Sequence, residues 1–280
     1  MLFVLLWSTG FVVAHYGTED AGPLTFLTMR LGAAAVLLWL VAAVTHAPQI
    51  NRVQVTWASV TGIGMHALYL GGVFVAIAHG LPSGLSALIA GLHPVITSVG
   101  ARLLLRERLY PVQWAGIGLG MVGVVAVVID RLRAHSGGIT GFALVAMAVS
   151  VIGMAGGTLV QRARGGSMPL LRGTAVQYTT AALILGVGAV FNEHWQAHAT
   201  PRLWFSLIWA VLVLSIAAVL IMMVLLQRQA AARVSSLFFL TPALSTIEGA
   251  ILFRERLGVL ALVGLVVALA GVWLTVRRRR

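Results

Sequence analysis

The sequence contains no cysteine and no lysine, and few of its residues carry charge. Without cysteine the chain can form no disulfide, thiolate nucleophile or cysteine-ligated metal site. Without lysine it cannot build the phosphate-binding loop of an ATPase, so ATP is not a direct energy source. Charged residues are 9% and hydrophobic residues 60% of the 280, whereas an ordinary soluble domain has about 25% charged residues. This balance indicates a protein that spans a membrane several times.

Ten apolar stretches are long enough to cross a bilayer, which takes about 20 mostly apolar residues per helix. Lipid offers the backbone no hydrogen-bond partner, so each stretch is predicted to be a helix. The first is short, but it lacks the positively charged start of a secretory signal and is interpreted as a span. The predicted spans are 1–16, 24–44, 56–78, 83–105, 111–130, 139–160, 170–191, 203–226, 233–253 and 257–276.

The chain repeats part of itself. Residues 91–109 read GLHPVITSVGARLLLRERL and residues 239–257 read FLTPALSTIEGAILFRERL, at an offset of 148 residues. Each half then holds five helices, and because five is odd the second half must start on the opposite side of the membrane. The sequence therefore predicts an all-α integral membrane protein with ten transmembrane helices in two inverted five-helix repeats, 1–130 and 139–276. In such proteins the site lies where the halves meet.

The net charge of +12 comes from 19 arginines. With a cytoplasmic N-terminus, 13 of them fall in predicted inner loops or the tail and 5 in outer loops, as the positive-inside rule prefers. Both termini are therefore expected in the cytoplasm. Residues 277–280 are interpreted as a basic cytoplasmic tail attracted to anionic membrane lipids. Since membrane topology explains the charge, no nucleic-acid partner is expected.

Several segments resemble a known family: WSTGFVVAHYG, PLTFLTMRLGAA, the two Pro-containing helices that end in LLLRERL and ILFRERL, and the Gly-rich helices after them. They are similar to the EamA-type transporters of the drug/metabolite transporter superfamily. The resemblance covers essentially the whole chain and implies ten transmembrane helices in two EamA repeats, in the inner membrane of a bacterium. It also implies export of amino acids, metabolites or toxic organic compounds. Arg106 and Arg254 stand where the family often has the glycine of G-E-R-L.

Polar residues present in only one half are candidates for function, and Glu248 is the clearest of them. Helical spacing places Glu248 on one face with Thr241 and Ser245. The equivalent face of the first half carries His93 and Thr97. A carboxylate near a helix centre costs about 2.5–3.5 kcal/mol and usually marks a transport pathway. We expect these five residues to line a substrate or proton pathway.

Arg30 lies about as deep in the second predicted span as Glu248 does in the ninth. We hypothesise that the two form an ion pair, which closes the outer side or binds a substrate's carboxylate and amine in turn. A static buried pair, or an arginine that reaches the membrane interface, is the alternative interpretation.

His66 and His93 are both predicted near the middle of the membrane. A histidine in a cavity can exchange protons at physiological pH, whereas a lone histidine more often bonds a neighbouring carbonyl. Trp7 is a candidate for stacking on an organic substrate, and Tyr178, the counterpart of Arg30 at the offset, for lining the cavity. Two isolated histidines make a poor metal site, so no metal or other cofactor is expected.

Pro94 and Pro242 occupy equivalent positions, where each removes a backbone hydrogen bond and bends its helix. The bends are candidate gates, or fixed kinks that shape the bundle. The string Gly118-x-Gly120-x-x-Gly123 matches a dinucleotide fingerprint, but no strand precedes it, so these glycines are interpreted as close helix contacts. Six tryptophans near predicted helix ends are interpreted as interface anchors: Trp39, Trp57, Trp114, Trp204, Trp209 and Trp273.

These features predict a secondary transporter that moves a small organic metabolite, amino acid or drug outward across the cytoplasmic membrane by alternating access. Its energy would come from the substrate gradient or from protons, through Glu248, His66 or His93. The rival interpretation is an integral-membrane enzyme acting on a lipid or prenyl group. Such enzymes usually need clustered acids or histidines at a membrane face, and the loops offer only scattered ones: Glu19, Asp20, Glu193, His194 and His198.

Overall fold

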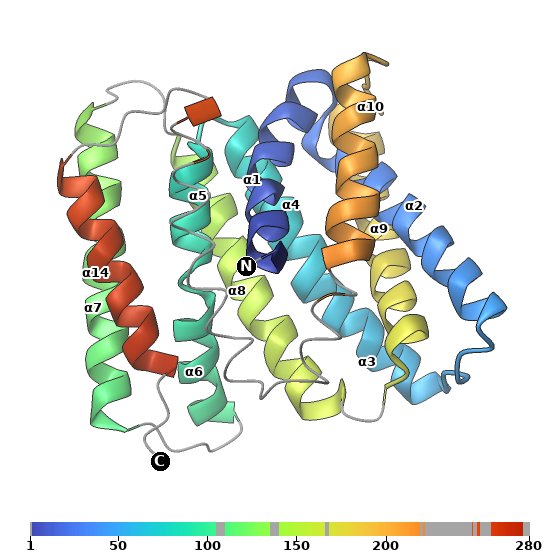
Figure 1. The fold of residues 1–280 in the computed structure, drawn as a ribbon, viewed down its shortest axis with the longest axis horizontal. Helices are drawn as coiled ribbons and strands as arrows, with labels where there is room; N and C mark the ends of the chain where they lie inside the picture. The colour runs from blue at the N-terminus through green and yellow to red at the C-terminus, as the bar shows by residue number, and fades with distance from the viewer. Residues whose placement is uncertain are drawn as a thin grey trace.

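The fold is a bundle of helices, seen in a computed structural model that describes residues 2–104, 110–134, 140–165, 168–218, 221, 248, 251–252 and 259–276. The helices, drawn in Figure 1, are α1 (Leu2–Asp20), α2 (Pro23–Val44), α3 (Arg52–Gly62), η1 (Ile63–Leu68), α4 (Tyr69–Ala78), α5 (Ser83–Ala90), α6 (His93–Leu104), α7 (Pro111–Ala134), α8 (Gly141–Arg164), α9 (Leu170–Glu193), α10 (Pro201–Ile208), η3 (Trp209–Ala218) and α14 (Val259–Val276). Here η marks a π-helical segment. The prediction of an all-α protein is confirmed for the described part of the chain.

The predicted spans coincide with these helices. Six stretches of the described residues are long and apolar enough to cross a membrane: Pro23–Val44, Arg52–Ala78, Ser83–Leu104, Gly141–Arg164, Leu170–Glu193 and Pro201–Ala218. The predicted spans 1–16, 111–130 and 257–276 fall on α1, α7 and α14. The predicted span 233–253 lies outside the described residues, apart from Glu248, Ile251 and Leu252.

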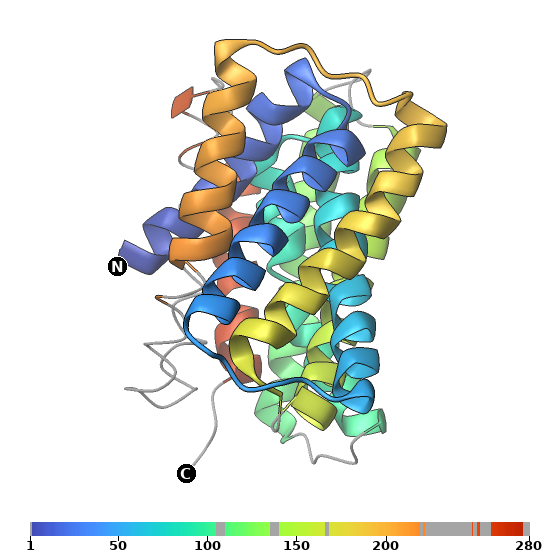
Figure 2. The same cartoon turned by 90° about the vertical axis from the view of Figure 1, so that its right-hand side faces the viewer.

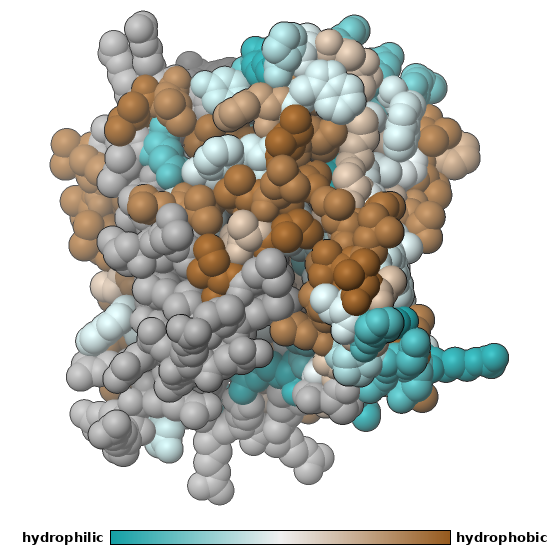
Figure 3. Space-filling view, turned by 45° about the vertical axis from the view of Figure 1, so that its right-hand side comes forward, coloured by the Kyte–Doolittle hydropathy of each residue, from teal (hydrophilic) through white to brown (hydrophobic). Residues whose placement is uncertain are grey.

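Large apolar side chains cover the outer surface of the bundle. Leu40 on α2 and Leu183 and Phe191 on α9 are 57%, 67% and 76% exposed, a pattern that would be costly in water and suits a lipid surround. Figure 3 shows a broad hydrophobic band across one face, with hydrophilic residues above it and at its lower right. This band is the surface expected to contact acyl chains.

Helices that hold equivalent positions in the two halves pack on each other. The helix α2 lies along α9, as Figure 2 shows, and α7 lies along α14 at one edge of the bundle. An added Cβ at Gly123 would lie 2.5 Å from the carbonyl oxygen of Gly264, and one at Gly271 would lie 2.6 Å from that of Gly116. The 148-residue offset exchanges these two contacts. The two helices therefore run antiparallel about a local two-fold axis.

The interpretation of the glycine string as close helix contacts is confirmed for Gly123, and for Gly120, whose Cα lies 2.6 Å from an added Cβ at Gly271. It is wrong for Gly118, where an added Cβ would have no atom within 4 Å because this position faces away from α14.

The third predicted span of each half contains a π-helical segment. The first is η1, residues 63–68. The same residues moved by the offset are 211–216, inside η3. A π-helical turn inserts an extra residue into the hydrogen-bond ladder and is frequent at functional sites. Hydropathy carries no signal for it, so the sequence did not predict these segments.

The fourth predicted span is broken at the proline. Pro94 has no N–H for the carbonyl of Ala90, and α5 ends at Ala90 while α6 begins at His93. The Nδ1 atom of His93 lies 3.0 Å from the Ala90 carbonyl oxygen and donates to it. The histidine thus satisfies the acceptor nearest the break. An interruption of the helix beside Pro94 is observed, and the bend at this proline stays a prediction. Its counterpart Pro242 lies outside the described residues.

The tryptophans divide into two groups. Trp114, Trp204 and Trp273 are about half exposed, as interface anchors would be. The anchor interpretation is wrong for two others, because their indole N–H groups bond inside the bundle: Trp39 donates to Thr179 at 3.1 Å and Trp209 donates to Thr9 at 3.0 Å. Both bonds join the two halves of the chain.

Candidate functional site

Polar side chains from both halves meet inside the bundle. We name this group the central polar cluster; its members are Arg30, His66, Tyr69, Gln177, Tyr178 and Ser215. They come from α2, η1, α4, α9 and η3. Arg30 and Ser215 are 7% and 1% exposed, and Gln177 and Tyr178 are 8% and 3% exposed. A cluster of this kind is unusual in a membrane bundle, where polar groups are costly and mark functional pathways.

Ser215 holds the cluster together. Its hydroxyl oxygen accepts a hydrogen bond of 3.2 Å from Nε of Arg30, and its carbonyl oxygen accepts one of 3.4 Å from the hydroxyl of Tyr178. Arg30 and Tyr178 occupy equivalent positions in the two halves. Where the two halves meet, the first half therefore contributes the cation of Arg30 and the second half the phenol of Tyr178, and both bind Ser215 of η3.

His66 extends the cluster towards α8. Its Nε2 atom lies 3.2 Å from Oε1 of Gln177, so this ring nitrogen donates. The amide nitrogen of Gln177 donates in turn to Gln161 at 3.4 Å. The ring of His66 packs edge-on against Tyr178, with 4.7 Å between ring centroids. The predicted cavity positions of Arg30, His66 and Tyr178 are thus brought together, and Ser215 is a member that the sequence did not indicate.

Glu248 binds a different partner from the one predicted. Its Oε1 atom lies 2.6 Å from the hydroxyl oxygen of Ser8 on α1, and its Oε2 atom is buried without a hydrogen-bond partner among the described residues. Arg30 instead bonds Ser215. The hypothesis of an Arg30–Glu248 pair is therefore not supported, because the two side chains bind different neighbours.

The surroundings of Glu248 differ from those of its counterpart. At the equivalent position in the first half, an added Cβ on Gly100 would lie 2.5 Å from Leu159 of α8. That contact is apolar and tightly packed, whereas Glu248 and Ser8 form a polar pair at the matching place. The carboxyl group is thus confined to one half of a nearly symmetric scaffold.

The other predicted pathway residues fall into three groups. Thr97 on α6 is 7% exposed, and its hydroxyl lacks a hydrogen-bond partner among the described residues. Trp7 precedes Ser8 on α1 and is half-buried. Thr241 and Ser245 lie outside the described residues, so their place on the pathway stays a prediction, as do the gating roles of Pro94 and Pro242.

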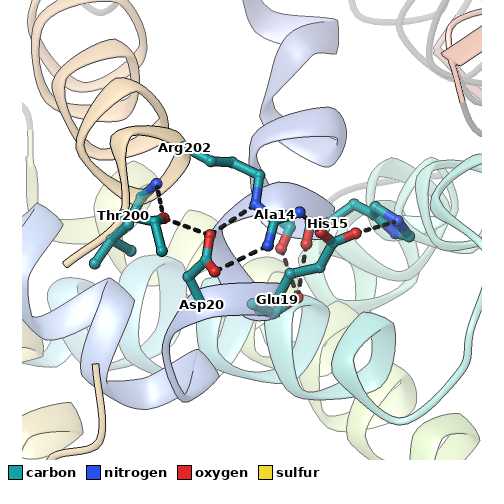
Figure 4. A network of polar contacts seen from close by, with 8 residues as sticks. Ala14, His15, Glu19, Asp20, Thr200 and Arg202 are labelled. Atoms are coloured by element: carbon teal, nitrogen blue, oxygen red, sulfur yellow. Dashed lines mark hydrogen bonds and ion pairs between the residues drawn. The ribbon is translucent and has the colours of Figure 1, made fainter. Parts of the chain in front are cut away.

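A second polar network joins α1 to α10 at one end of the bundle. Asp20 binds Arg202 through two hydrogen bonds, Nε to Oδ2 at 2.7 Å and Nη2 to Oδ1 at 2.9 Å. Thr200 donates to Asp20 at 2.8 Å, and Arg202 also pairs with Glu19, as Figure 4 shows. We call Asp20, Thr200 and Arg202 the loop latch. The sequence suggested only scattered loop acids here.

Glu193 acts as a helix cap at the same end. Its Oε1 atom accepts from the N–H of Leu24 at 2.9 Å, and its Oε2 atom accepts from the N–H of Thr25 at 2.8 Å. These are orphan donors of the first turn of α2, whose N-cap residue Gly22 has no side chain to satisfy them. A carboxylate at this positive helix end is stabilising, and it ties α9 to α2.

Replacing Asp20 by Asn should lower the thermal stability of the protein, because the amide cannot reproduce the charged pair with Arg202. Hydrogen bonds from Arg202 and Thr200 lower the pKa of Asp20 from 3.8 to about 2. Because the pKa of Asp20 is lower in the folded protein than in the unfolded chain, the ion pair with Arg202 stabilises the folded state fully at pH values above the pKa of the unfolded chain. This stabilisation is lost as the pH falls through the pKa of the folded protein. The Tm difference between wild type and Asp20→Asn should therefore be constant from about pH 8 to pH 5 and shrink between about pH 4 and pH 2.

The matched control is Asn192→Ala, at the same end of the bundle, where a neutral amide donates to Gly188 at 2.9 Å. Its effect on Tm should not depend on pH. If the Tm difference between wild type and Asp20→Asn also did not depend on pH, the loop latch would not contain a charged pair.

Among the described residues there is no group of three or more histidine, aspartate or glutamate side chains that could hold a metal ion. The described residues offer two polar features in an apolar bundle: the central polar cluster where the two halves meet, and the carboxyl group of Glu248 bound to Ser8. Such an arrangement can bind and release a small polar molecule within the membrane.

Known proteins share both the sequence and the fold. The chain is 26% identical to a protein of Escherichia coli named "Probable amino-acid metabolite efflux pump", over 99% of this chain and 93% of that protein. It is 24% identical to the "Uncharacterized transporter YvbV" of Bacillus subtilis, over 97% and 88%. It also matches part of the "Uncharacterized inner membrane transporter YedA" of Escherichia coli, 27% identical over 43% of this chain and 39% of that protein.

A solved crystal structure has the same fold, with a TM-score of 0.63 at 17% identity, over 98% of this chain and 93% of the other. The model of the EamA-like transporter family matches twice, at residues 1–129 and 141–277. The two matches lie on the two halves that the internal repeat and the α7/α14 contact distinguish. The chain is therefore a multi-pass membrane protein that belongs to the EamA-like transporter family, with one copy of the family's domain in each half.

Proposed function

We propose that the chain is a secondary transporter that exports a small organic metabolite, amino acid or drug across the cytoplasmic membrane by alternating access. Ten helices form two inverted repeats, residues 1–130 and 139–276. Both termini are cytoplasmic, with 277–280 as a basic tail on anionic lipid. Because the family is one of transporters, the alternative of a lipid-modifying enzyme is set aside.

The observation that carries the proposal is the central polar cluster. Arg30 and His66 come from the first half, and Gln177, Tyr178 and Ser215 from the second. A site built from both halves changes shape when the halves rock against each other, which is what alternating access requires. The antiparallel contact of α7 with α14 supports the inverted arrangement, since a two-fold axis in the membrane plane relates helices in this way.

Export, rather than import, is supported by relatives. Proteins of Escherichia coli and Salmonella typhimurium, each 26% identical over 99% of this chain, are named probable amino-acid metabolite efflux pumps. A third relative is named an inner membrane transporter. These names point to an exporter of small metabolites in the cytoplasmic membrane.

Proton coupling through Glu248 is supported by the hydrogen bonds of Ser8. The Ser8 hydroxyl oxygen lies 3.0 Å from the carbonyl oxygen of Leu5 and 2.6 Å from Oε1 of Glu248. A serine hydroxyl has one hydrogen and can accept through its lone pairs. The Ser8 hydroxyl donates to Oε1 of Glu248, and Oε2 is buried without a hydrogen-bond partner among the described residues. A charge in an apolar bundle is costly, so this carboxyl group is suited to take up a proton inside the membrane and release it.

The export proposal is tested by comparing metabolites inside and outside cells of a bacterial strain that lacks the gene, with and without a plasmid carrying it. Export predicts at least one metabolite that accumulates in the deletion strain and returns to the medium on complementation. Uptake from the medium on complementation would reverse the proposed direction. Unchanged metabolites on both sides would contradict the proposal.

A further inference from the structure

We propose that Arg30, held by Ser215 at the seam of the two halves, binds the carboxylate of the transported substrate, so that the cargo is an organic acid or amino acid. This inference rests on the transport function proposed above and names the chemical class of its substrate. It is carried by the charge balance and the hydrogen-bond geometry around Arg30.

The chain itself supplies no carboxylate to Arg30 among the described residues. Four of its seven acidic residues have described side chains, and each is engaged elsewhere. Glu19 and Asp20 bind Arg202, Glu193 caps α2, and Glu248 binds Ser8. The other three stand beside arginines in the sequence, near predicted helix ends: Glu107, Asp130 and Glu255.

A buried cation without a counterion is costly. Arg30 begins two turns into α2, about 10 Å from its first residue at 1.5 Å per residue, and is 93% buried. Charges taken out of water need a partner of opposite sign or they destabilise the fold. Ser215 offers only a neutral hydroxyl to Nε. An anionic group on the substrate would remove this cost, and the relief of the buried charge would contribute to the free energy of substrate binding.

The geometry suits a carboxylate. A guanidinium has five N–H donors in a fixed plane. With Nε on Ser215, the two Nη atoms remain to bind both oxygens of one carboxylate, the paired geometry that arginine favours. The rings of Tyr178 and His66 lie in the same cluster and would contact the organic part of the cargo.

The position also suits transport. Arg30 bonds η3, and His66 lies on η1, the two π-helical segments at equivalent places in the halves. Substrate bound to Arg30 would therefore contact both halves at their matching irregular turns. Tyr178, the counterpart of Arg30, provides no second cation, so the site has one place for an anionic group.

The test combines stability with the identity of the exported metabolites, for Arg30→Gln, Arg30→Lys and wild type. Removal of an uncompensated charge should raise the Tm of the purified, substrate-free Arg30→Gln protein, whereas loss of a structural contact would lower it. In cells, the metabolites exported by wild type should carry a carboxylate. Their export should fall about tenfold or more in Arg30→Gln, the size expected for losing a charged hydrogen-bonded pair, and in part only in Arg30→Lys, which keeps the charge.

The control is Arg172→Gln, at the start of α9, where the arginine bonds Ala47 and Gln49. It should lower Tm slightly and leave the exported set unchanged. Three results would each overturn the assignment of Arg30 as the carboxylate-binding residue while leaving a working transporter. These are exported metabolites that are neutral or cationic, wild-type export by Arg30→Gln, and a lower Tm for that variant. Absence of any exported metabolite in wild type would instead refute the transport function, and the assignment with it.

Discussion

Replacing Glu248 by Gln is expected to abolish transport driven by a pH gradient while leaving substrate exchange intact. The amide is nearly isosteric and its oxygen can accept a hydrogen bond from Ser8 as Oε1 of Glu248 does, so the contact of α1 with this position would survive. The amide cannot release a proton, however. A transporter that couples proton movement to substrate movement through Glu248 would therefore no longer be driven by the pH gradient. The measurement is substrate accumulation in proteoliposomes under an imposed pH gradient, beside exchange of labelled for unlabelled substrate without a gradient.

The expected loss is large: gradient-driven accumulation should fall to the level of empty liposomes, with exchange near the wild-type rate. Glu193→Gln is the matched control, because this carboxylate caps α2 outside the cluster. It should lower Tm and still accumulate substrate. Full gradient-driven accumulation by Glu248→Gln would show that the carboxyl group only packs against Ser8, and that transport follows the substrate gradient or uses another proton carrier.

Replacing Gly123 by Ala should strongly destabilise the bundle. The new Cβ would lie 2.5 Å from the Gly264 carbonyl oxygen and 2.8 Å from Cα of Ala268, both backbone atoms that cannot move without shifting α14. Overpacking of this kind costs about 1–3 kcal/mol. The two-fold relation predicts the same loss for Gly271→Ala, which meets Gly116 and Gly120. Thermal unfolding in detergent would measure both.

Gly118→Ala is the control on the same helix, because an added Cβ there has no atom within 4 Å. It should be neutral or stabilising, since Ala is favoured over Gly in a helix by about 1 kcal/mol. The two destabilising changes should not add, because they strain one interface. Equal Tm values for Gly123→Ala and Gly118→Ala would contradict the close crossing of α7 and α14.

Much of the fold was predictable from the sequence because hydropathy and helix-breaking residues act locally. Apolar stretches placed the described spans, and Pro94 marked the break between α5 and α6. The absence of a preceding strand identified the glycine string as a packing motif, which is right for Gly123 but not for Gly118. The π-helical segments were not predicted. One extra residue in the helical hydrogen-bond ladder changes neither the composition nor the apolar face enough to be detected in the sequence.

Three members of the central polar cluster were predicted, whereas the other predicted pathway residues are not among its members. Arg30, His66 and Tyr178 were singled out and do lie together. Ser215 was missed because a lone serine in the apolar run LVLSIAA gives no signal. Glu193 and Asp20 were taken for scattered loop acids, although one caps a helix distant in the sequence and the other binds Arg202.

By itself the sequence determined that this is a duplicated, all-helical membrane protein with an acid, Glu248, and an arginine, Arg30, well inside its apolar spans. Only the tertiary structure decided that Arg30 faces Ser215 and that Glu248 faces Ser8. The physical reason is that helical periodicity defines which residues share a face, whereas the neighbour that a face meets depends on how each helix is rotated and shifted by packing along its whole length.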